Sequence, residues 1–211
     1  MLIVKYDHGQ LLEEPMNNTK ILILNGHPGQ ASLSRAIADT YAKAATEAGH
    51  FVRRHDLSDM QFDMDFGQSD YRAAKKLEPS LETFMEDLNW ADHFVLATPL
   101  WWGGLPAKLK GLFDRAFLPG LAFDPRTVRA GFPKPLLVGK SARVVMTSDT
   151  PMWVMRLFYR RAIQHQLTGQ ILKFVGITPT RYSHFAPIKD ANPDIFDGWL
   201  DKVAVLGGKA A

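Results

Sequence analysis

The segment Ala97–Phe117 contains residue types that are suited to holding a flat ligand. Its sequence, ATPLWWGGLPAKLKGLFDRAF, places Trp101 and Trp102 between an apolar run and the glycine pair that begins at Gly103. Glycines let the backbone approach a ligand closely, and indoles offer stacking surfaces. Because large aromatic side chains are usually buried, one of the two indoles is expected in the core, but not both. We therefore predict a site for a planar, electron-poor heterocycle.

A second glycine-containing segment follows the apolar run Lys20–Asn25. In GHPGQASLS, two glycines precede Ser32 and Ser34, and a helical pattern begins directly behind them. Backbone N–H groups at a helix N-terminus, together with the helix dipole, favour phosphate binding. The spacing matches neither the dinucleotide glycine fingerprint nor a P-loop. An ordinary strand–helix turn with Ser34 as the N-cap is the alternative interpretation.

A third polar segment, TSDTPMW, runs from Thr147 to Trp153 after another apolar run. Thr150 precedes Pro151 and is expected to be the N-cap of the next helix. A capped helix start is a sufficient explanation for this segment alone. Its position is more informative, because it follows an apolar run in the same way as the two segments above.

Apolar runs and helical patterns alternate five times along the chain. The expected strands are Lys20–Asn25, His50–His55, Asp92–Thr98, Ser141–Thr147 and Thr178–His184, and the expected helices are Arg35–Ala48, Pro79–Trp90, Leu105–Phe117, Pro151–Val175 and Asn192–Leu206. This alternation is typical of a three-layer α/β fold with a parallel sheet between two layers of helices. The three polar segments follow the first, third and fourth strands, so we expect them at the edge where such sheets bind ligands.

At these three segments the sequence resembles the flavodoxin-like NAD(P)H:quinone oxidoreductase family, over roughly Lys20 to Leu206. GHPGQASLS is similar to that family's flavin phosphate loop. PLWWGGLPAKLKGLFDRAFLPGLAF is similar to its isoalloxazine loop and following helix, and TSDTP stands where the family has its third flavin loop. The resemblance implies a three-layer α/β/α flavodoxin-like fold with a five-stranded parallel sheet in the order 2-1-3-4-5. Residues 19–211 would form a single flavin-binding domain, and residues 1–18 an N-terminal arm.

The resemblance also implies a set of flavin-binding residues. His27, Ser32, Leu33 and Ser34 would hold the phosphates, Pro99, Leu100, Trp101, Trp102 and Gly103 would line the ring, and Thr147 and Ser148 would complete that edge. The family includes FAD and FMN enzymes, and His27 favours FAD, with FMN as the alternative. NADH or NADPH would pass a hydride through flavin N5 to a quinone or similar acceptor by a ping-pong mechanism. A flavin-binding electron carrier or accessory subunit without turnover is the alternative function.

The third loop departs from the family pattern. The best-studied quinone reductases have Thr-Thr-Gly-Gly there, followed by a tyrosine and a histidine near the flavin, whereas Asp149, Thr150 and Pro151 stand in place of the glycines in this chain. No Tyr/His pair stands at that spacing. The catalytic residues are therefore unassigned, and the nearest candidates are Trp153, Arg156 and Tyr159.

Composition limits the classes of function. The chain has 211 residues, about one large domain, of which 46% are hydrophobic. Its net charge of +3 is too small to indicate nucleic-acid binding, and no apolar run is long enough for a membrane span. The N-terminus lacks the pattern of a secretory signal, so a cytoplasmic location is expected. The absence of cysteine excludes disulfides and thiolate metal sites.

No metal site is expected from the acidic segment between the second strand and the second helix. Asp63, Asp65 and Gly67 partly match a calcium loop, but that loop needs a glutamate at its twelfth position, where Ala74 stands. The histidines also lack the spacing of metal ligands.

A homodimer is expected. The family is typically homodimeric, with the active site completed by the partner chain. Several large aromatic residues of this chain fall in expected loops or turns, namely Phe62, Phe66, Trp101, Trp102 and Phe123. A single domain of this size has limited means to bury them all, and a two-fold interface would bury some.

Overall fold

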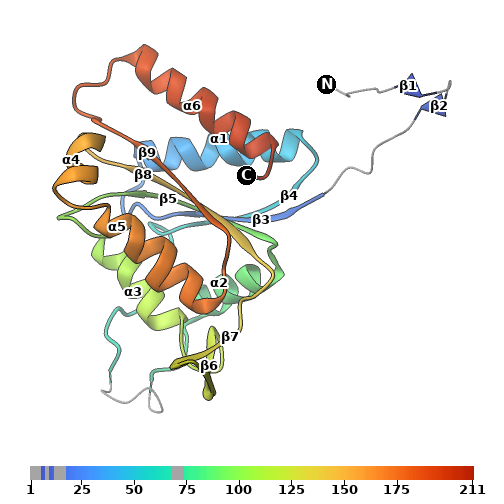
Figure 1. Cartoon of the computed structure of the whole chain (residues 1–211), viewed down its shortest axis with the longest axis vertical. Helices are drawn as coiled ribbons and strands as arrows, with labels where there is room; N and C mark the ends of the chain where they lie inside the picture. The colour runs from blue at the N-terminus through green and yellow to red at the C-terminus, as the bar shows by residue number, and fades with distance from the viewer. Residues whose placement is uncertain (1–5, 8–9, 12–17, 68–73) are drawn as a thin grey trace.

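The computed structural model describes residues 6–7, 10–11, 18–67 and 74–211. Its centre is a five-stranded parallel sheet in the order β4-β3-β5-β8-β9 (Figure 1). The strands are β3 (Lys20–Asn25), β4 (Phe51–Asp56), β5 (His93–Pro99), β8 (Ser141–Thr147) and β9 (Thr180–Phe185). Numbered among themselves along the chain, these strands have the order 2-1-3-4-5, so the predicted topology is confirmed.

Helices cover both faces of the sheet. Consecutive residues of a strand point to opposite faces, so each strand contributes side chains to the core on both sides. In β3, Leu22 and Leu24 belong to one core cluster, whereas Ile21 and Ile23 belong to the other. The first cluster includes residues of α2 (Pro79–Trp90), α3 (Ala107–Ala116), α5 (Ala162–His165) and the π-helical stretch η2 (Gln166–Lys173), and the second includes residues of α1 (Leu33–Glu47) and α6 (Pro193–Gly208) (Figure 1). The three inner strands β3, β5 and β8 are covered on both faces and are largely apolar, which made these runs recognisable in the sequence.

Two antiparallel hairpins lie outside the central sheet. β1 (Tyr6–Asp7) pairs with β2 (Gln10–Leu11), and β6 (Phe123–Arg129) pairs with β7 (Phe132–Pro135). The sequence analysis did not predict the second hairpin, since most of β6 is exposed and polar. The glycine of the pair Ala130–Gly131 was the available signal in the sequence. These two residues join the strands with φ of 52° and 82°, as a two-residue hairpin turn requires.

The helix expected over Pro151–Val175 is interrupted. α4 (Met152–Leu157) ends before α5 begins, and between them Arg160 and Arg161 have φ of 48° and 55°. Non-glycine residues adopt such angles infrequently, so the residue types gave no signal of the break.

Two helix caps also differ from the expectation. α1 is capped by Ser32, whose hydroxyl accepts a hydrogen bond from the Arg35 N–H at 3.1 Å, and not by Ser34. α4 has Pro151 at the cap position, and no side chain caps it, so Thr150 is not its N-cap.

One buried cation holds the irregular segment between β4 and α2 to the core. The fully buried Arg115 side chain of α3 donates hydrogen bonds to the backbone oxygens of Asp63 and Lys76 and to the carboxylate of Glu78. Asp63 and Asp65, the residues that partly match a calcium loop, both accept from Lys75 Nζ, at 2.7 and 3.2 Å.

Within the described ranges, no group of three or more histidine and acidic side chains is placed to hold a metal ion. No helix in those ranges has the length and hydropathy needed to cross a bilayer.

Candidate functional site

The segments that follow β3, β5 and β8 meet at the carboxyl edge of the sheet. Backbone hydrogen bonds join them: the Gly26 N–H donates to the Ala97 oxygen at 2.7 Å, and the Leu100 N–H donates to the Thr147 oxygen at 2.8 Å. The expectation that the three predicted loops lie together is therefore confirmed by their register.

The buried side-chain amide of Asn25, at the end of β3, fixes the first loop. Asn25 is fully buried, its Nδ2 donates to Asp56 Oδ1 at 2.8 Å, and its Oδ1 accepts from the His27 N–H at 3.2 Å. The Gly29 N–H in turn donates to His27 Nδ1 at 2.9 Å. A neutral His27 in this arrangement carries its proton on Nε2, which leaves Nε2 as a donor for a ligand.

The start of α1 contains an unpaired hydroxyl. Ser34 is 1% exposed, and its Oγ has no hydrogen-bond partner among the residues that the structure describes. It lies in the first turn of a 15-residue helix, where backbone N–H groups and the helix dipole favour an anion. Buried hydroxyls are normally paired, so the atom that is lacking here is an acceptor, and a phosphate oxygen meets that need.

The second loop forms a tight turn. Trp101 and Gly104 exchange backbone hydrogen bonds of 3.0 and 2.9 Å, and Trp102 and Gly103 between them have φ of 50° and 73°. Trp101 is 43% exposed and Trp102 is fully exposed, so neither indole belongs to the core, contrary to the expectation for one of them. The Trp101 ring lies edge-on to His27, with ring centroids 5.5 Å apart, and this contact joins the first and second loops.

The third loop differs from the first two because the polar groups of Ser148 already form hydrogen bonds within the chain. Ser148 is buried, its N–H donates to the Phe185 oxygen, and its own carbonyl oxygen accepts from the Ile188 N–H, both at 3.1 Å. Its Oγ donates to the Thr150 oxygen at 3.1 Å and lies 2.7 Å from His184 Nε2. Thr147 is also buried. These two residues hold the loop against β9.

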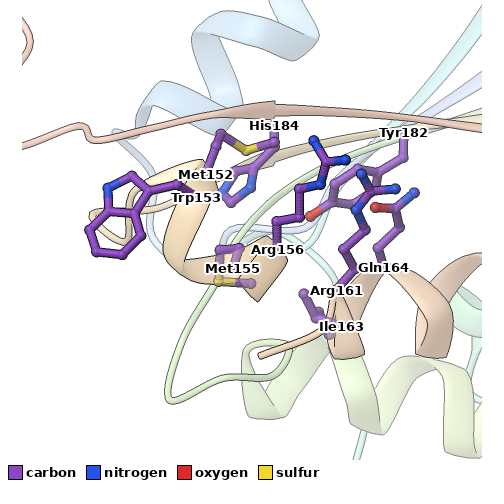
Figure 2. A pocket seen from close by; sticks show the side chains of 9 residues that line it. All are labelled: Met152, Trp153, Met155, Arg156, Arg161, Ile163, Gln164, Tyr182 and His184. Carbon is purple, nitrogen blue, oxygen red and sulfur yellow. The ribbon is translucent and has the colours of Figure 1, made fainter. Parts of the chain in front are cut away.

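A pocket of about 460 Å³ lies beside the third loop (Figure 2). It is lined by Met152, Trp153, Met155 and Arg156 from α4, by Arg161, Ile163 and Gln164 at and near the start of α5, and by Tyr182 and His184 from β9. Of the three catalytic candidates, Trp153 and Arg156 line it and Tyr159 does not. Figure 2 shows the Trp153 indole pointing away from the Arg156 side chain.

Sequence reasoning missed the contribution of β9 to this pocket. Tyr182 and His184 are two positions apart in a strand, so their side chains share a face, and the strand ends at the same edge as the three loops. That alternation was the available signal. Burial lowers the pKa of His184 below 6.5 and raises the pKa of Tyr182, so both side chains are neutral at neutral pH. The charges on the pocket wall therefore belong to Arg156 and Arg161.

A parallel five-stranded sheet between two layers of helices, in the order β4-β3-β5-β8-β9 and with three loops meeting at its carboxyl edge, defines a flavodoxin-like α/β protein. The chain belongs to the family described as "Flavodoxin-like fold", whose model matches residues 19–206. The family that the sequence resembled is thereby confirmed, and named relatives of the chain are NAD(P)H and NADH:quinone oxidoreductases, which confirms the class of enzyme.

Three comparisons illustrate the relationship. The chain is 30% identical to the FMN-dependent NADH:quinone oxidoreductase of Nitratidesulfovibrio vulgaris, over 82% of this chain and 89% of that protein. It is 28% identical to a ribosyldihydronicotinamide dehydrogenase-like protein of Penicillium crustosum, over 61% of this chain and 57% of that longer relative. The crystal structure of Smu.1420 from Streptococcus mutans has 29% identity and a TM-score of 0.76, covering 90% of this chain and 98% of that one.

Proposed function

We propose that this chain binds FMN and reduces quinones or similar acceptors with electrons from NADH or NADPH. The observation that carries the proposal is the buried, unpaired Ser34 hydroxyl at the start of α1, beside the exposed Trp101–Gly104 turn. An acceptor atom at the helix start and a planar ring at the turn together describe a flavin. FMN replaces FAD as the favoured flavin because a relative that aligns over 82% of this chain is named FMN-dependent.

The proposed flavin-binding residues are those expected from the sequence. His27, Ser32, Leu33 and Ser34 hold the phosphate, Pro99, Leu100, Trp101, Trp102 and Gly103 line the ring, and Thr147 and Ser148 fix the loop at its third edge. When bound, the flavin supplies hydride transfer at N5 in a ping-pong sequence. The overall reaction consumes NAD(P)H, a proton and a quinone, and yields NAD(P)⁺ and a hydroquinone.

The cofactor is tested by releasing it. Purified protein is expected to yield stoichiometric flavin on heating, and chromatography separates FMN from FAD. Anaerobic addition of NADH or NADPH is expected to bleach the flavin absorbance, and a quinone is expected to restore it over many turnovers. Protein that binds neither flavin after reconstitution contradicts the proposal. A flavin that bleaches but supports no quinone turnover supports the electron-carrier alternative.

We further propose that residues 19–211 form one domain behind an N-terminal arm, residues 1–18, and that the chain is a homodimer. Of the aromatic residues expected at the interface, Phe62 and Phe123 pack against the core, whereas Trp101 and Trp102 are exposed. Further exposed apolar side chains lie on α4 and the following turn: Trp153, Leu157, Phe158 and Tyr159 are each at least 58% exposed. Apolar patches of this kind mark protein interfaces.

The dimer is tested by light scattering at micromolar concentration. The expected mass is about twice the 23.7 kDa of one chain. Phe158→Glu places a charge in the proposed interface and is expected to give the mass of one chain, whereas Phe51→Glu, at an exposed residue of β4, is the matched control. A wild-type chain that is monomeric and fully active contradicts the homodimer.

A further inference from the structure

The pocket beside the third loop combines an apolar wall with two unpaired cations. Met155 and Ile163 are buried in the wall, and the Tyr182 ring lies between α5 and the sheet. Among the described residues, neither Arg156 nor Arg161 has an ion pair or a side-chain hydrogen bond, and no acidic side chain lines the pocket. By contrast, Arg53, Arg54 and Arg115 all pair with carboxylates.

The interruption between α4 and α5 brings these two arginines together. In a continuous helix, residues five positions apart lie about 140° apart around the axis and do not share a face. Here α4 ends at Leu157, and Arg160 and Arg161, with φ of 48° and 55°, separate it from α5, so Arg156 and Arg161 do not belong to one continuous helix. Figure 2 shows the Arg156 and Arg161 side chains both extending toward Tyr182, with Gln164 beside them. Left-handed backbone at a non-glycine residue costs conformational free energy. Here two such residues accompany the convergence of two positively charged side chains on one pocket.

The pocket is also connected to the proposed flavin site. His184, which lines the pocket, lies with Nε2 2.7 Å from Ser148 Oγ, and Ser148 belongs to the third loop. α4 begins four residues after Ser148 and carries Arg156 in its last turn. A ligand in the pocket therefore lies next to the loop that borders the flavin ring in the proposed function.

We propose that this pocket binds the acidic group of the electron acceptor, so that Arg156 and Arg161 select quinones with a carboxylate or sulfonate over uncharged quinones. The inference rests on the proposed function and deepens it. A guanidinium offers two parallel N–H donors that match the oxygens of a carboxylate or sulfonate. Two unpaired cations of like charge in one concave site attract an anion, and the methionine and tyrosine wall suits a planar ring.

The test compares two acceptors that differ by one charge. The ratio of kcat/KM for 1,2-naphthoquinone-4-sulfonate to that for 1,2-naphthoquinone is measured for the wild-type holoenzyme, Arg156→Gln and Arg161→Gln. Each variant is expected to lower this ratio by about tenfold or more, since a charge-assisted pair is lost. Arg160→Gln is the matched control, because Arg160 has a similar φ but does not line the pocket. Lysine at either position is expected to restore part of the ratio.

A binding measurement separates this proposal from the proposed function. Calorimetric titration of the holoprotein with naphthalene-2-sulfonate requires no turnover, and its affinity is expected to fall in Arg156→Gln and Arg161→Gln but not in Arg160→Gln. If no quinone is reduced but this binding pattern holds, the anion pocket is supported and the quinone function fails. The proposal is overturned if all three variants lose the same affinity, if none does, or if only the KM for NADPH rises, which would assign the arginines to the donor's phosphate.

Discussion

On one side of the proposed flavin site, the loops after β3 and β5 hold each other through the Gly26–Ala97 hydrogen bond and the contact between His27 and Trp101. On the other side, the segment after β8 leads into a short helix and a left-handed break, and the two arginines that flank the break have no side-chain partner within the described part of the chain. The segments of the first side could be recognised from their own sequence and resemble the family pattern, whereas the third loop departs from that pattern and its neighbours come together only in the folded chain. If the proposed function holds, cofactor binding and acceptor choice are encoded in different parts of the chain.

The largest effect is expected at the turn that approaches the flavin ring. Gly103→Val is expected to weaken FMN binding by about a hundredfold, or about 2.7 kcal/mol, because a branched side chain occupies ligand space. A Cβ at Gly103 meets no protein atom within 4 Å, so the chain itself offers no steric conflict. Titration of the apoprotein with FMN, followed by fluorescence, measures the affinity.

Backbone strain is the competing explanation for that loss, because Gly103 has a φ of 73°. Gly120→Val is the matched control: Gly120 has a φ of 85° and also has no atom within 4 Å of an added Cβ, but it lies after α3. An equal loss of FMN in both variants would assign the effect to strain and would remove Gly103 from the site.

A smaller effect is expected at Ser32 and Ser34, at the start of α1. Their replacement by alanine is expected to change the free energy of unfolding in opposite directions. Ser34→Ala removes an unpaired buried hydroxyl, so the free energy of unfolding of the apoprotein is expected to rise by about 1 kcal/mol while FMN affinity falls about tenfold. Ser32→Ala removes the N-cap and is expected to lower that free energy by about 1 kcal/mol. Urea denaturation with and without FMN measures both. Equal destabilisation of the two apoproteins would show that Ser34 has a partner.

The smallest effect concerns the pocket side and its dependence on pH. Burial lowers the pKa of His184 below 6.5, so the unfolded chain takes up this proton before the folded chain does. Its contribution to stability is therefore complete above pH 6.5 and is lost as the pH falls toward the lowered pKa. His184→Gln is expected to make the decrease in stability below pH 6.5 shallower.

The control for this comparison is His93, at the opposite end of the sheet. His93 is buried, mainly by desolvation its pKa is lowered to about 4, and it stays in place in the His184→Gln variant. The acid sensitivity that remains in the variant belongs to His93 and to carboxylates such as Asp56 and Glu78, whose pKa values are also lowered. A pH profile identical to that of the wild type would show that His184 does not titrate in this range.

The elements that the sequence predicted best are those with local causes. The strand Lys20–Asn25 and the helix Pro79–Trp90 have the predicted bounds, because one is a continuous apolar run and the other begins with a proline in its first turn. The three loops were found for the same reason, since each directly follows such a strand.

The parts that were missed depend on contacts between distant segments. Arg160 and Arg161 have no turn-forming character, so the residue types gave no signal of their left-handed angles. His184 was assigned to a strand, but its meeting with Ser148 depends on the pairing of β8 with β9. Ser148 was expected to complete the edge of the flavin ring site, and the sequence could not show that its hydroxyl contacts His184 and Thr150.

Arg115 has a consequence for engineering the chain. Its guanidinium donates to the backbone oxygens of Asp63 and Lys76. Both ends of the stretch from 63 to 76 are therefore held by the same buried side chain. Because these hydrogen bonds are accepted by backbone oxygens, they do not depend on the side chains between residues 63 and 76. The entropic cost of closing a loop grows slowly with its length, about 0.6 kcal/mol for each doubling. An epitope tag or reporter peptide inserted within this stretch is therefore expected to leave the sheet and the loops at its carboxyl edge intact.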